Sequence, residues 1–545
     1  MTARTLPPVN APPVPAAVRH DYRRRGFVTD QTVTTLASRA ARRWPERPAV
    51  IEGGRVITHR ELLRLVEQIG GWLSAQGVGA GHAVCWQSPN WWEAHVVSLA
   101  IWHVGAVSVP LAPIYREHEL RHVIALTQPA AVVTTPTYRG FDHADAFDTI
   151  LSESGGAEVA RLMLRGTRPG WTSFAELAAG DARCTAAQVQ ADDPCLVLFT
   201  SGTTAAAKGA VHSSTSLLAE TRQLVDAWRI GCDDVSYMPA PLQHITGLLN
   251  AITIPALSGA CSVLAERWAP DRAVMDMQRH QVTWTAGATV FLEELSAAAE
   301  AARTRLALQT FVCGGAPVAR PVMERAEAQG IPAVRVYGMT ELPTVTVMDG
   351  SAPFDLRADT DGALAPGVEA RIVPDADDGP TTEGEIVVRG PERMLGYLVD
   401  AENVAALDAE GWFATGDLGR LDAAGHVTVT GRTKDVINRG GEKFSAREIE
   451  DLLLRHPDVR EAAVVAAPDE RFGEVPVAFV VLAGGRTGGA PALAHHLQQQ
   501  GLARQKTPVD WHVRGDLPRT PSGKVKKFVL VDEIARRRKQ GGRDG

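Results

Sequence analysis

Apolar and polar residues repeat along the chain with two different periods. Short apolar runs, such as residues 83–87 (AVCWQ) and 106–111 (AVSVPL), have the length and composition of buried strands. Between them, residues 61–77 and 91–105 repeat apolar side chains every three or four positions, as amphipathic helices do. Because strands that alternate with helices form sheets covered by helices, the pattern predicts an α/β fold.

A different pattern begins at Gly384. From there to Arg432, short apolar runs are separated by glycine turns, which predicts a small β-barrel-like subdomain. A fresh pattern of a helix and strands then begins, so we place a domain boundary near Lys434. The predicted parts are a flexible N-terminal arm over residues 1–25, a large domain of two α/β subdomains plus the barrel-like subdomain over residues 26–433, and a small, mobile α+β domain over residues 434–545.

Composition and charge limit the classes of function. The 545 residues are 45% hydrophobic and 22% charged, with a formal charge of −7, which argues against a nucleic acid held through its phosphates. Six scattered cysteines form no C-x-x-C pair and favour buried thiols in a reducing compartment. Neither a signal segment nor an apolar run of about 18 residues occurs, so we expect a cytoplasmic protein without a membrane span. Monomer and homodimer both stay open.

The strongest local signal is a hydroxyl-rich loop after an apolar strand at residues 195–199. Small residues let backbone N–H groups turn toward an anion, hydroxyls add donors, and a lysine adds a charge. The loop therefore predicts a polyphosphate cradle, although it lacks the P-loop spacing. Its residues are Thr200, Ser201, Gly202, Thr203, Thr204 and Lys208.

This loop resembles the signature of the adenylate-forming superfamily, which contains acyl-CoA synthetases, luciferases and nonribosomal-peptide adenylation domains. The superfamily pattern is T-S-G-T-T-G-x-P-K-G, and here Ala205 replaces a glycine and Ala207 replaces the proline. Both changes leave the hydroxyls and Lys208 in place. Six further motifs follow in the superfamily's order up to residue 527, so the resemblance extends from the loop to the C-terminal region.

By resemblance, two motifs hold the adenine ring and a metal ion. In VYGMTE, Thr340 would meet phosphate and Glu341 would hold Mg²⁺, which suits a hard cation that prefers carboxylate and phosphate oxygens. The residues implied along the adenine ring are Gly314, Gly315 and Ala316 of VCGGAPV and the stacking Tyr337.

Two later motifs are implied to hold the ribose and to connect the domains. Asp417, in WFATGDLGRLD, would accept hydrogen bonds from both ribose hydroxyls, as an ionised carboxylate can. Arg432 opens the longest match, GRTKDVINRGGEKFSAREIE, and would reach the ribose or a phosphate. In the same match, Lys434 falls at the superfamily's hinge, and Gly440 and Gly441 would border the pantetheine channel in a second conformation.

The remaining motifs concern the acid. His244, in PLQHITG, would line the path between the acyl pocket and the thiol channel, with Gln243 replacing an aromatic residue of the superfamily. Lys524, in PRTPSGKVKK, would bridge the substrate carboxylate and the α-phosphate in the transition state. The residues implied around an apolar acid, whether aryl, alicyclic or medium-chain, are His244, Val336, Gly338 and Met339.

The resemblance implies a ligase that uses ATP and Mg²⁺ to convert a carboxylic acid to an acyl-adenylate, releases pyrophosphate, and transfers the acyl group to coenzyme A. The small domain would swing about Lys434 between the two steps, taking Lys524 away from the cleft. A stand-alone aryl-acid adenylation enzyme that loads a carrier protein is one alternative. An ATP-dependent diazotase that activates nitrite for an aromatic amine is another.

One short motif points to a different class of enzyme. HELRH formally matches H-E-x-x-H, in which His118 and His122 would bind Zn²⁺ and Glu119 would act as the base of a metalloprotease. The same segment suits a polar amphipathic helix, and no third ligand pattern follows it. A non-catalytic binding protein is the last alternative, and the intact charged residues of the motifs argue against it.

Overall fold

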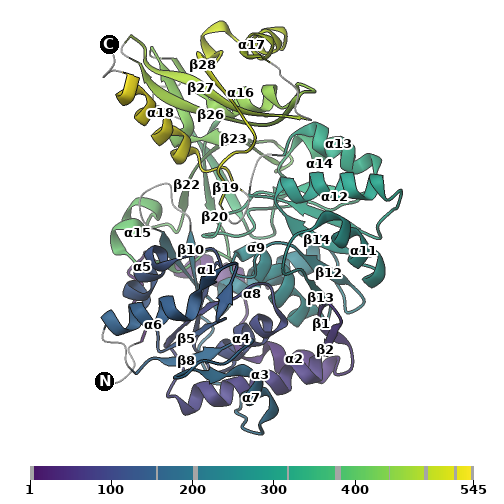
Figure 1. The fold of residues 1–545 in the computed structure, drawn as a ribbon, viewed down its shortest axis with the longest axis vertical. Helices are drawn as coiled ribbons and strands as arrows, with labels where there is room; N and C mark the ends of the chain where they lie inside the picture. Colours follow the sequence, from purple (N-terminus) through teal and green to yellow (C-terminus); the bar gives the residue numbers. More distant parts are fainter. Residues whose placement is uncertain are drawn as a thin grey trace.

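The chain folds into a large α/β domain with a smaller domain at one end (Figure 1). The computed structural model describes residues 5–154, 158–200, 207–315, 318–374, 382–440, 442–469, 471–483, 489–520 and 524–541. The smaller domain, yellow-green to yellow in Figure 1, is formed by the C-terminal part of the chain. The predicted α/β class with a small C-terminal domain is therefore confirmed.

The first large sheet is mostly parallel and carries the predicted phosphate loop at one strand end. Every residue of β3 (Ala83–Gln87) is buried, because this strand pairs in parallel with a strand on each side and is covered on both faces. This burial explains the continuous apolar run AVCWQ in the sequence. The strand order is β21 (Gly396–Tyr397), β11 (Lys208–Ser213), β10 (Pro194–Thr200), β4 (Val107–Leu111), β3 (Ala83–Gln87), β5 (Ala131–Thr134), β8 (Ala160–Met163) and β9 (Thr172–Ser173).

The second large sheet is parallel except for one antiparallel hairpin at its edge, formed by β1 and β2. Its strand β16 leads directly into the segment that contains Tyr337. The strand order is β16 (Ala333–Arg335), β15 (Thr310–Cys313), β14 (Trp284–Gly287), β12 (Val235–Met238), β13 (Cys261–Leu264), β1 (Pro48–Glu52) and β2 (Arg55–Thr58).

Helices fill the space between the two sheets and cover their outer faces. In α4 (Trp92–His103) every residue after the first is buried, as expected of a helix enclosed on all sides. The same core contains α2 (Leu36–Arg43), α3 (His59–Ala75), α8 (Ser214–Ala227) and α10 (Ile254–Ser258). The outer helices are α5 (Glu117–Thr127) and α6 (His143–Glu153) on the first sheet, and α11 (Pro270–His280), α12 (Thr289–Ala301) and α13 (Arg320–Ala328) on the second. Among the described helices, none is long and apolar enough to cross a membrane.

Two smaller sheets follow in the chain, besides the two-stranded pairs β6 (Thr137–Tyr138) with β7 (Phe141–Asp142) and β17 (Thr346–Val347) with β18 (Ala363–Leu364). A four-stranded antiparallel sheet, at the place of the predicted barrel-like subdomain, runs β19 (Glu369–Val373), β20 (Gly384–Arg389), β22 (Phe413–Leu421) and β23 (Val427–Arg432). The sheet of the small domain runs β25 (Glu442–Ser445), β24 (Val436–Arg439), β27 (Gly473–Leu482) and β26 (Val459–Asp469), with β28 (Asp510–Arg514) also paired to β27. Its two faces are covered by α16 (Ala446–Leu453) and α17 (Ala490–Gln499) on one side and by α18 (Lys527–Gly541) on the other.

The N-terminal stretch differs from the expected flexible arm. It contains α1 (Ala16–Arg24), and the backbone N–H of Leu6 donates to the carbonyl of Gly81 at 2.8 Å. Tyr22 is only 4% exposed and packs with Ala219 of α8. These contacts are made between segments far apart in the sequence, so the Pro- and Ala-rich composition alone does not reveal them.

Two carboxyl groups are completely buried beneath the segment that carries Glu341. Glu220 of α8 and Glu392, which follows β20, are each 0% exposed. The hydroxyl of Thr344 donates to Glu220, and Gln223 Nε2 lies 3.4 Å from Glu392 Oε2. Burial raises the pKa of both carboxyl groups, and the neighbouring Glu220 raises the pKa of Glu392 further. Burial therefore favours the protonated form of both carboxyl groups.

We predict that Glu392→Gln stabilises the protein at alkaline pH. The pKa of Glu392 is raised on folding, so the folded state binds more protons and stability falls as pH rises from the unfolded pKa through the folded one. Glutamine cannot ionise and avoids this loss. The melting temperature of the variant should exceed that of the wild type by about 2–4 °C at pH 9 and by less at pH 5. Glu369→Gln, at a half-exposed carboxylate paired with Arg389, is the control, and equal shifts at both pH values would contradict the account.

Candidate functional site

A cavity of about 820 Å³ lies where the large and small domains meet. Seven of the residues implied by the sequence motifs line it, although they are spread over more than 200 positions of the chain: Gly315, Val336, Tyr337, Gly338, Asp417, Arg432 and Lys524. Parallel strands of the second sheet end at this cavity, where ligands of α/β proteins usually bind. We therefore take it as the candidate active site.

The pairing of β22 with β23 positions two polar side chains that line the cavity. Asp417 on β22 is directly opposite Arg432 on β23, and Arg432 Nε lies 2.8 Å from Asp417 Oδ1. The hydroxyl of Tyr337 donates to Asp417 Oδ2 at 2.8 Å. Burial, followed by the charge of Asp417, raises the pKa of Tyr337 well above its usual value, so its hydroxyl stays a donor. The Asp417 carboxylate is thereby held between a tyrosine hydroxyl and a guanidinium group.

Lys524 reaches this cavity from the small domain. A side chain on Gly315, which has φ +77°, would lie 3.2 Å from Lys524 Cε, so a glycine here lets the lysine pass. Burial, and then the charge of Arg432, lowers the pKa of the Lys524 amine. The carboxylates of Asp417 and Glu341 oppose that shift. The amine therefore lies among the groups implied to hold the ribose and the metal ion.

Glu341 is oriented by a residue that the sequence motifs do not identify. The hydroxyl of Tyr397 donates to Glu341 Oε1 at 2.6 Å, and the N–H of Met394 donates to the Glu341 carbonyl at 2.8 Å. Lys208 Nζ lies 5.1 Å from the centre of the Tyr397 ring and 3.9 Å from Glu402 Oε1. In the sequence, Tyr397 is marked only by the Gly-Tyr pair that it forms with Gly396, shortly after the segment GEIVVRG. Tyr397 thus connects the lysine of the phosphate loop to the candidate metal ligand.

Thr340 is held by its backbone. Its carbonyl oxygen lies 2.8 Å from Nε2 of His212, which must carry the hydrogen because a carbonyl can only accept. Burial lowers the pKa of His212 to about 4, so the ring is neutral at physiological pH. His212 follows the phosphate loop on β11 and was not identified from the sequence. It ties that strand to the segment with Thr340 and Glu341.

His244, the residue implied to lie near the acid, caps the short helix α9 (Ile245–Leu248) at its N-terminus. Its Nδ1 accepts from the N–H of Thr246 at 3.4 Å. Burial, and then the charge of Lys524, lowers the pKa of His244 to about 4. Val336 and Gly338 line the same cavity as the nucleotide residues. A neutral imidazole near Lys524 adds no cation to compete for the carboxylate of the acid.

Several predicted positions lie elsewhere. Thr200 ends β10 and Lys434 lies in the 3₁₀ turn Thr433–Asp435, while Gly440 forms the turn between β24 and β25. Burial, and then the charge of Arg432, lowers the pKa of Lys434. Met339 is half-buried. Ser201, Gly202, Thr203, Thr204, Ala316 and Gly441 lie outside the described residues.

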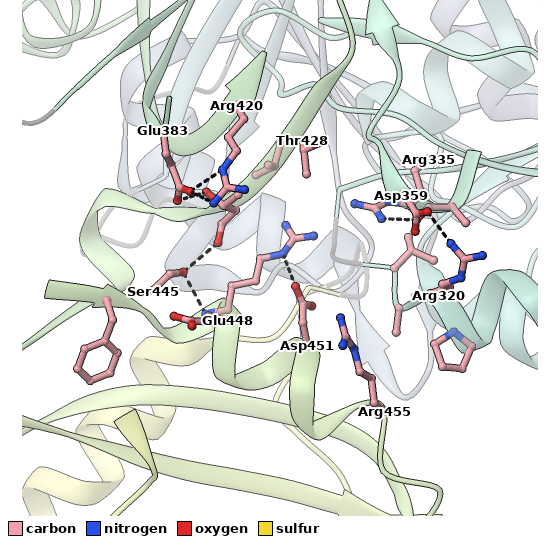
Figure 2. A pocket seen from close by; sticks show the side chains of 18 of the residues that line it. Arg320, Arg335, Asp359, Glu383, Arg420, Thr428, Ser445, Glu448, Asp451 and Arg455 are labelled. Carbon is pink, nitrogen blue, oxygen red and sulfur yellow. Dashed lines mark hydrogen bonds and ion pairs between the residues drawn. The ribbon is translucent and has the colours of Figure 1, made fainter. Parts of the chain in front are cut away.

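A second cavity, of about 940 Å³, lies between α13, the four-stranded antiparallel sheet that contains β22 and β23, and α16 (Figure 2). Several of its charged side chains are already paired: Arg420 lies 2.7 Å from Glu383, and Arg447 lies 3.4 Å from Asp451. The hydroxyl of Ser445 donates across the domain boundary to a backbone carbonyl of β23 at 2.9 Å. None of the residues that the resemblance implies for the nucleotide lines this cavity, so we do not assign the nucleotide to it.

The HELRH segment lies on α5. His118 is exposed, whereas Nε2 of His122 lies 2.8 Å from the carbonyl oxygen of Ala207. Within the described part of the chain, no three His, Cys, Asp or Glu side chains are grouped as metal ligands would be. His122 therefore contacts the end of the phosphate loop, and the zinc-protease hypothesis gains no support from this helix.

Comparisons with known proteins match both domains. The family model described as AMP-binding enzyme matches residues 37–398, and that of the AMP-binding enzyme C-terminal domain matches residues 448–524. The medium-chain fatty-acid–CoA ligase of Escherichia coli (strain K12) is 36% identical over 530 residues, which span 95% of this chain and 93% of that protein. The salicyl-AMP ligase / salicyl-S-ArCP synthetase of Mycobacterium tuberculosis is 30% identical, over 96% of this chain and 94% of that protein.

A solved structure has the same architecture. ATP-bound MatB from Rhodopseudomonas palustris superposes with a TM-score of 0.82 at 30% sequence identity, over 92% of this chain and 98% of that chain. The match takes in both the large and the small domain. Since the family model also covers well over half of the residues, this chain belongs to the AMP-binding enzyme family, within the adenylate-forming superfamily that its motifs resemble.

Proposed function

We propose that this chain is an AMP-forming ligase that activates a small, apolar carboxylic acid with ATP and transfers the acyl group to coenzyme A. The observation that carries the proposal is the convergence of Lys524, from the small domain, with Asp417 and Arg432 in one cavity. The relative from Escherichia coli is named a medium-chain fatty-acid–CoA ligase, which supports both the apolar acid and the acceptor.

In the first half-reaction, a carboxylate oxygen attacks the α-phosphorus of ATP and the bond to the bridging oxygen breaks, so that pyrophosphate leaves. Both reactants are anions, and catalysis therefore consists mainly of positioning and charge neutralisation. Asp417 would hold the ribose, and Lys208 would contact the terminal phosphates. Lys524 would lie between the attacking carboxylate and the α-phosphate, two anions that favour its charged form.

Glu341 is the proposed ligand of Mg²⁺. Its carboxylate is oriented by Tyr397 close to Lys208, and one protein carboxylate with phosphate oxygens and water is the usual ligand set of this ion. When bound, Mg²⁺ would neutralise charge on the phosphates that leave. The described residues thus suit the ion without a cluster of acidic side chains.

In the second half-reaction, the thiol sulfur of coenzyme A attacks the acyl carbon, the bond to AMP breaks, and the thiol loses its proton. Lys524 occupies the cavity in the present arrangement, so we propose that the small domain, beginning at Lys434, rotates between the steps. The rotation would withdraw Lys524 and bring the Gly440–Gly441 turn to the cleft. The six cysteines carry free thiols, which suits the reducing cytoplasm proposed for the reaction.

A carrier protein is the second candidate acceptor. The relative from Mycobacterium tuberculosis is named a salicyl-S-ArCP synthetase, and it matches nearly the whole chain. A screen of carboxylic acids by pyrophosphate release, with coenzyme A, with a phosphopantetheinylated carrier protein, or with nitrite and an aromatic amine, separates the candidates. We expect acid-dependent release that coenzyme A accelerates. Release that depends on the carrier or on nitrite would replace the proposed acceptor or substrate, and no release with any acid would overturn the function.

We predict that Lys524→Ala lowers the rate of acyl-adenylate formation by about 10²–10³, because one charge contact of the transition state is lost. Conversion of supplied acyl-adenylate to thioester should continue, since Lys524 is withdrawn in that step. The two half-reactions are measured separately by pyrophosphate exchange and by thioester formation. Lys526→Ala, in the same C-terminal segment, is the control. Equal loss of both half-reactions would contradict the assigned role.

We predict that Lys434→Pro blocks thioester formation and spares pyrophosphate exchange. Proline restricts φ to about −65° and removes the backbone N–H, so it stiffens the connection on which the rotation depends. Thioester turnover should fall by about tenfold or more, whereas Lys434→Ala, which leaves the backbone free, should retain it. Normal thioester turnover in the proline variant would remove the hinge from the mechanism.

A further inference from the structure

The backbone just after the phosphate loop is fixed by the first sheet. Thr200 on β10 pairs with Lys208 on β11, and the N–H of Leu398 donates to the Gly209 carbonyl at 2.9 Å. A Cβ at Gly209 would lie 2.9 Å from Leu398 Cδ1, so any side chain there would require Leu398 to shift. From Lys208 onward, therefore, the strand itself holds the chain.

The residue before Lys208 lies outside that ladder and is held by a side chain. Nε2 of His122, on α5, lies 2.8 Å from the carbonyl oxygen of Ala207, and the imidazole packs edge-on against Phe199 at 6.2 Å. A carbonyl accepts only, so Nε2 carries the hydrogen. His118, one helical turn earlier, is exposed. Of the two histidines of the HELRH segment, His122 is the one that contacts the loop.

His122 holds the peptide group between Ala207 and Lys208, and the orientation of this group affects the position of Lys208. Lys208 Nζ lies 5.1 Å from the centre of the Tyr397 ring, and Tyr397 in turn donates to Glu341. In the superfamily pattern a proline stands at position 207, where its ring restricts φ. Alanine lacks this restriction, and the extra freedom opposes an ordered loop end. A hydrogen bond from His122 to the Ala207 carbonyl supplies a different restraint on the same residue.

We propose that His122 is a positioning residue for ATP binding: it fixes the Ala207 peptide, and through it Lys208, in place of the absent proline ring. The inference rests on the proposed function, because Lys208 is taken there to contact the phosphates. It gives the HELRH segment a role that does not involve a metal ion. It also predicts that the histidine and a proline at position 207 are interchangeable.

The test is the affinity for ATP and Mg²⁺ without acid, measured by titration calorimetry on the full-length protein. His122→Ala should weaken binding by about three- to tenfold, the effect of one lost hydrogen bond. His118→Ala, one turn away on the same helix, should leave the affinity unchanged. His122→Gln can donate its amide N–H to the same carbonyl and should recover most of the loss. In initial-rate assays, KM for ATP should rise and KM for the acid should not.

The interchange is tested by a double-mutant cycle. Ala207→Pro in the His122→Ala background should restore ATP affinity to within about twofold of the wild type, and the two changes should be non-additive. Wild-type affinity in His122→Ala, or equal losses in His122→Ala and His118→Ala, would overturn the inference. So would a loss that neither His122→Gln nor Ala207→Pro repairs, because it would indicate a general structural defect. If the wild type binds ATP but turns over no acid, only the proposed function fails.

Discussion

The Asp417 carboxylate accepts a hydrogen bond from Tyr337 on one oxygen and pairs with Arg432 on the other. Tyr337 follows a strand of the second large sheet, and Arg432 lies on β23 of the four-stranded antiparallel sheet. Lys524 approaches the same carboxylate from the small domain. A buried carboxylate needs such partners, because burying it without hydrogen bonds would be strongly destabilising. The geometry of the cleft therefore depends on three separate parts of the chain meeting at one side chain.

The position of Lys524 explains how one cavity can serve two half-reactions. Lys524 lines the cavity in this arrangement, and we propose that its amine lies where the carboxylate and the α-phosphate meet, which would favour adenylate formation and obstruct the thiol. Where Ser445 meets β23, a hydrogen bond from the small domain crosses to the large domain, beside two ion pairs that each lie within one domain. A hydrogen bond of this kind is compatible with a rotation of the small domain.

The sequence predicted the α/β class, the small C-terminal domain and the residues that meet in the cleft, because short motifs keep Tyr337, Asp417 and Lys524 at recognisable spacings. It did not predict the contacts that orient them. Tyr397 and Glu341 are 56 residues apart, and His212 and Thr340 are 128 residues apart. Such pairs are set by strand order in the first sheet and leave no local pattern. The same reason explains α1, whose Pro- and Ala-rich surroundings suggest an arm until Tyr22 is seen to be buried.

The most direct test of the account is a crystal structure of the protein with ATP and Mg²⁺. The account predicts the ribose hydroxyls on Asp417, the phosphates between Lys208 and the ion on Glu341, and the Lys524 amine next to the α-phosphate. A nucleotide bound in the ion-paired cavity of Figure 2, with the cleft around Asp417 empty, would contradict it.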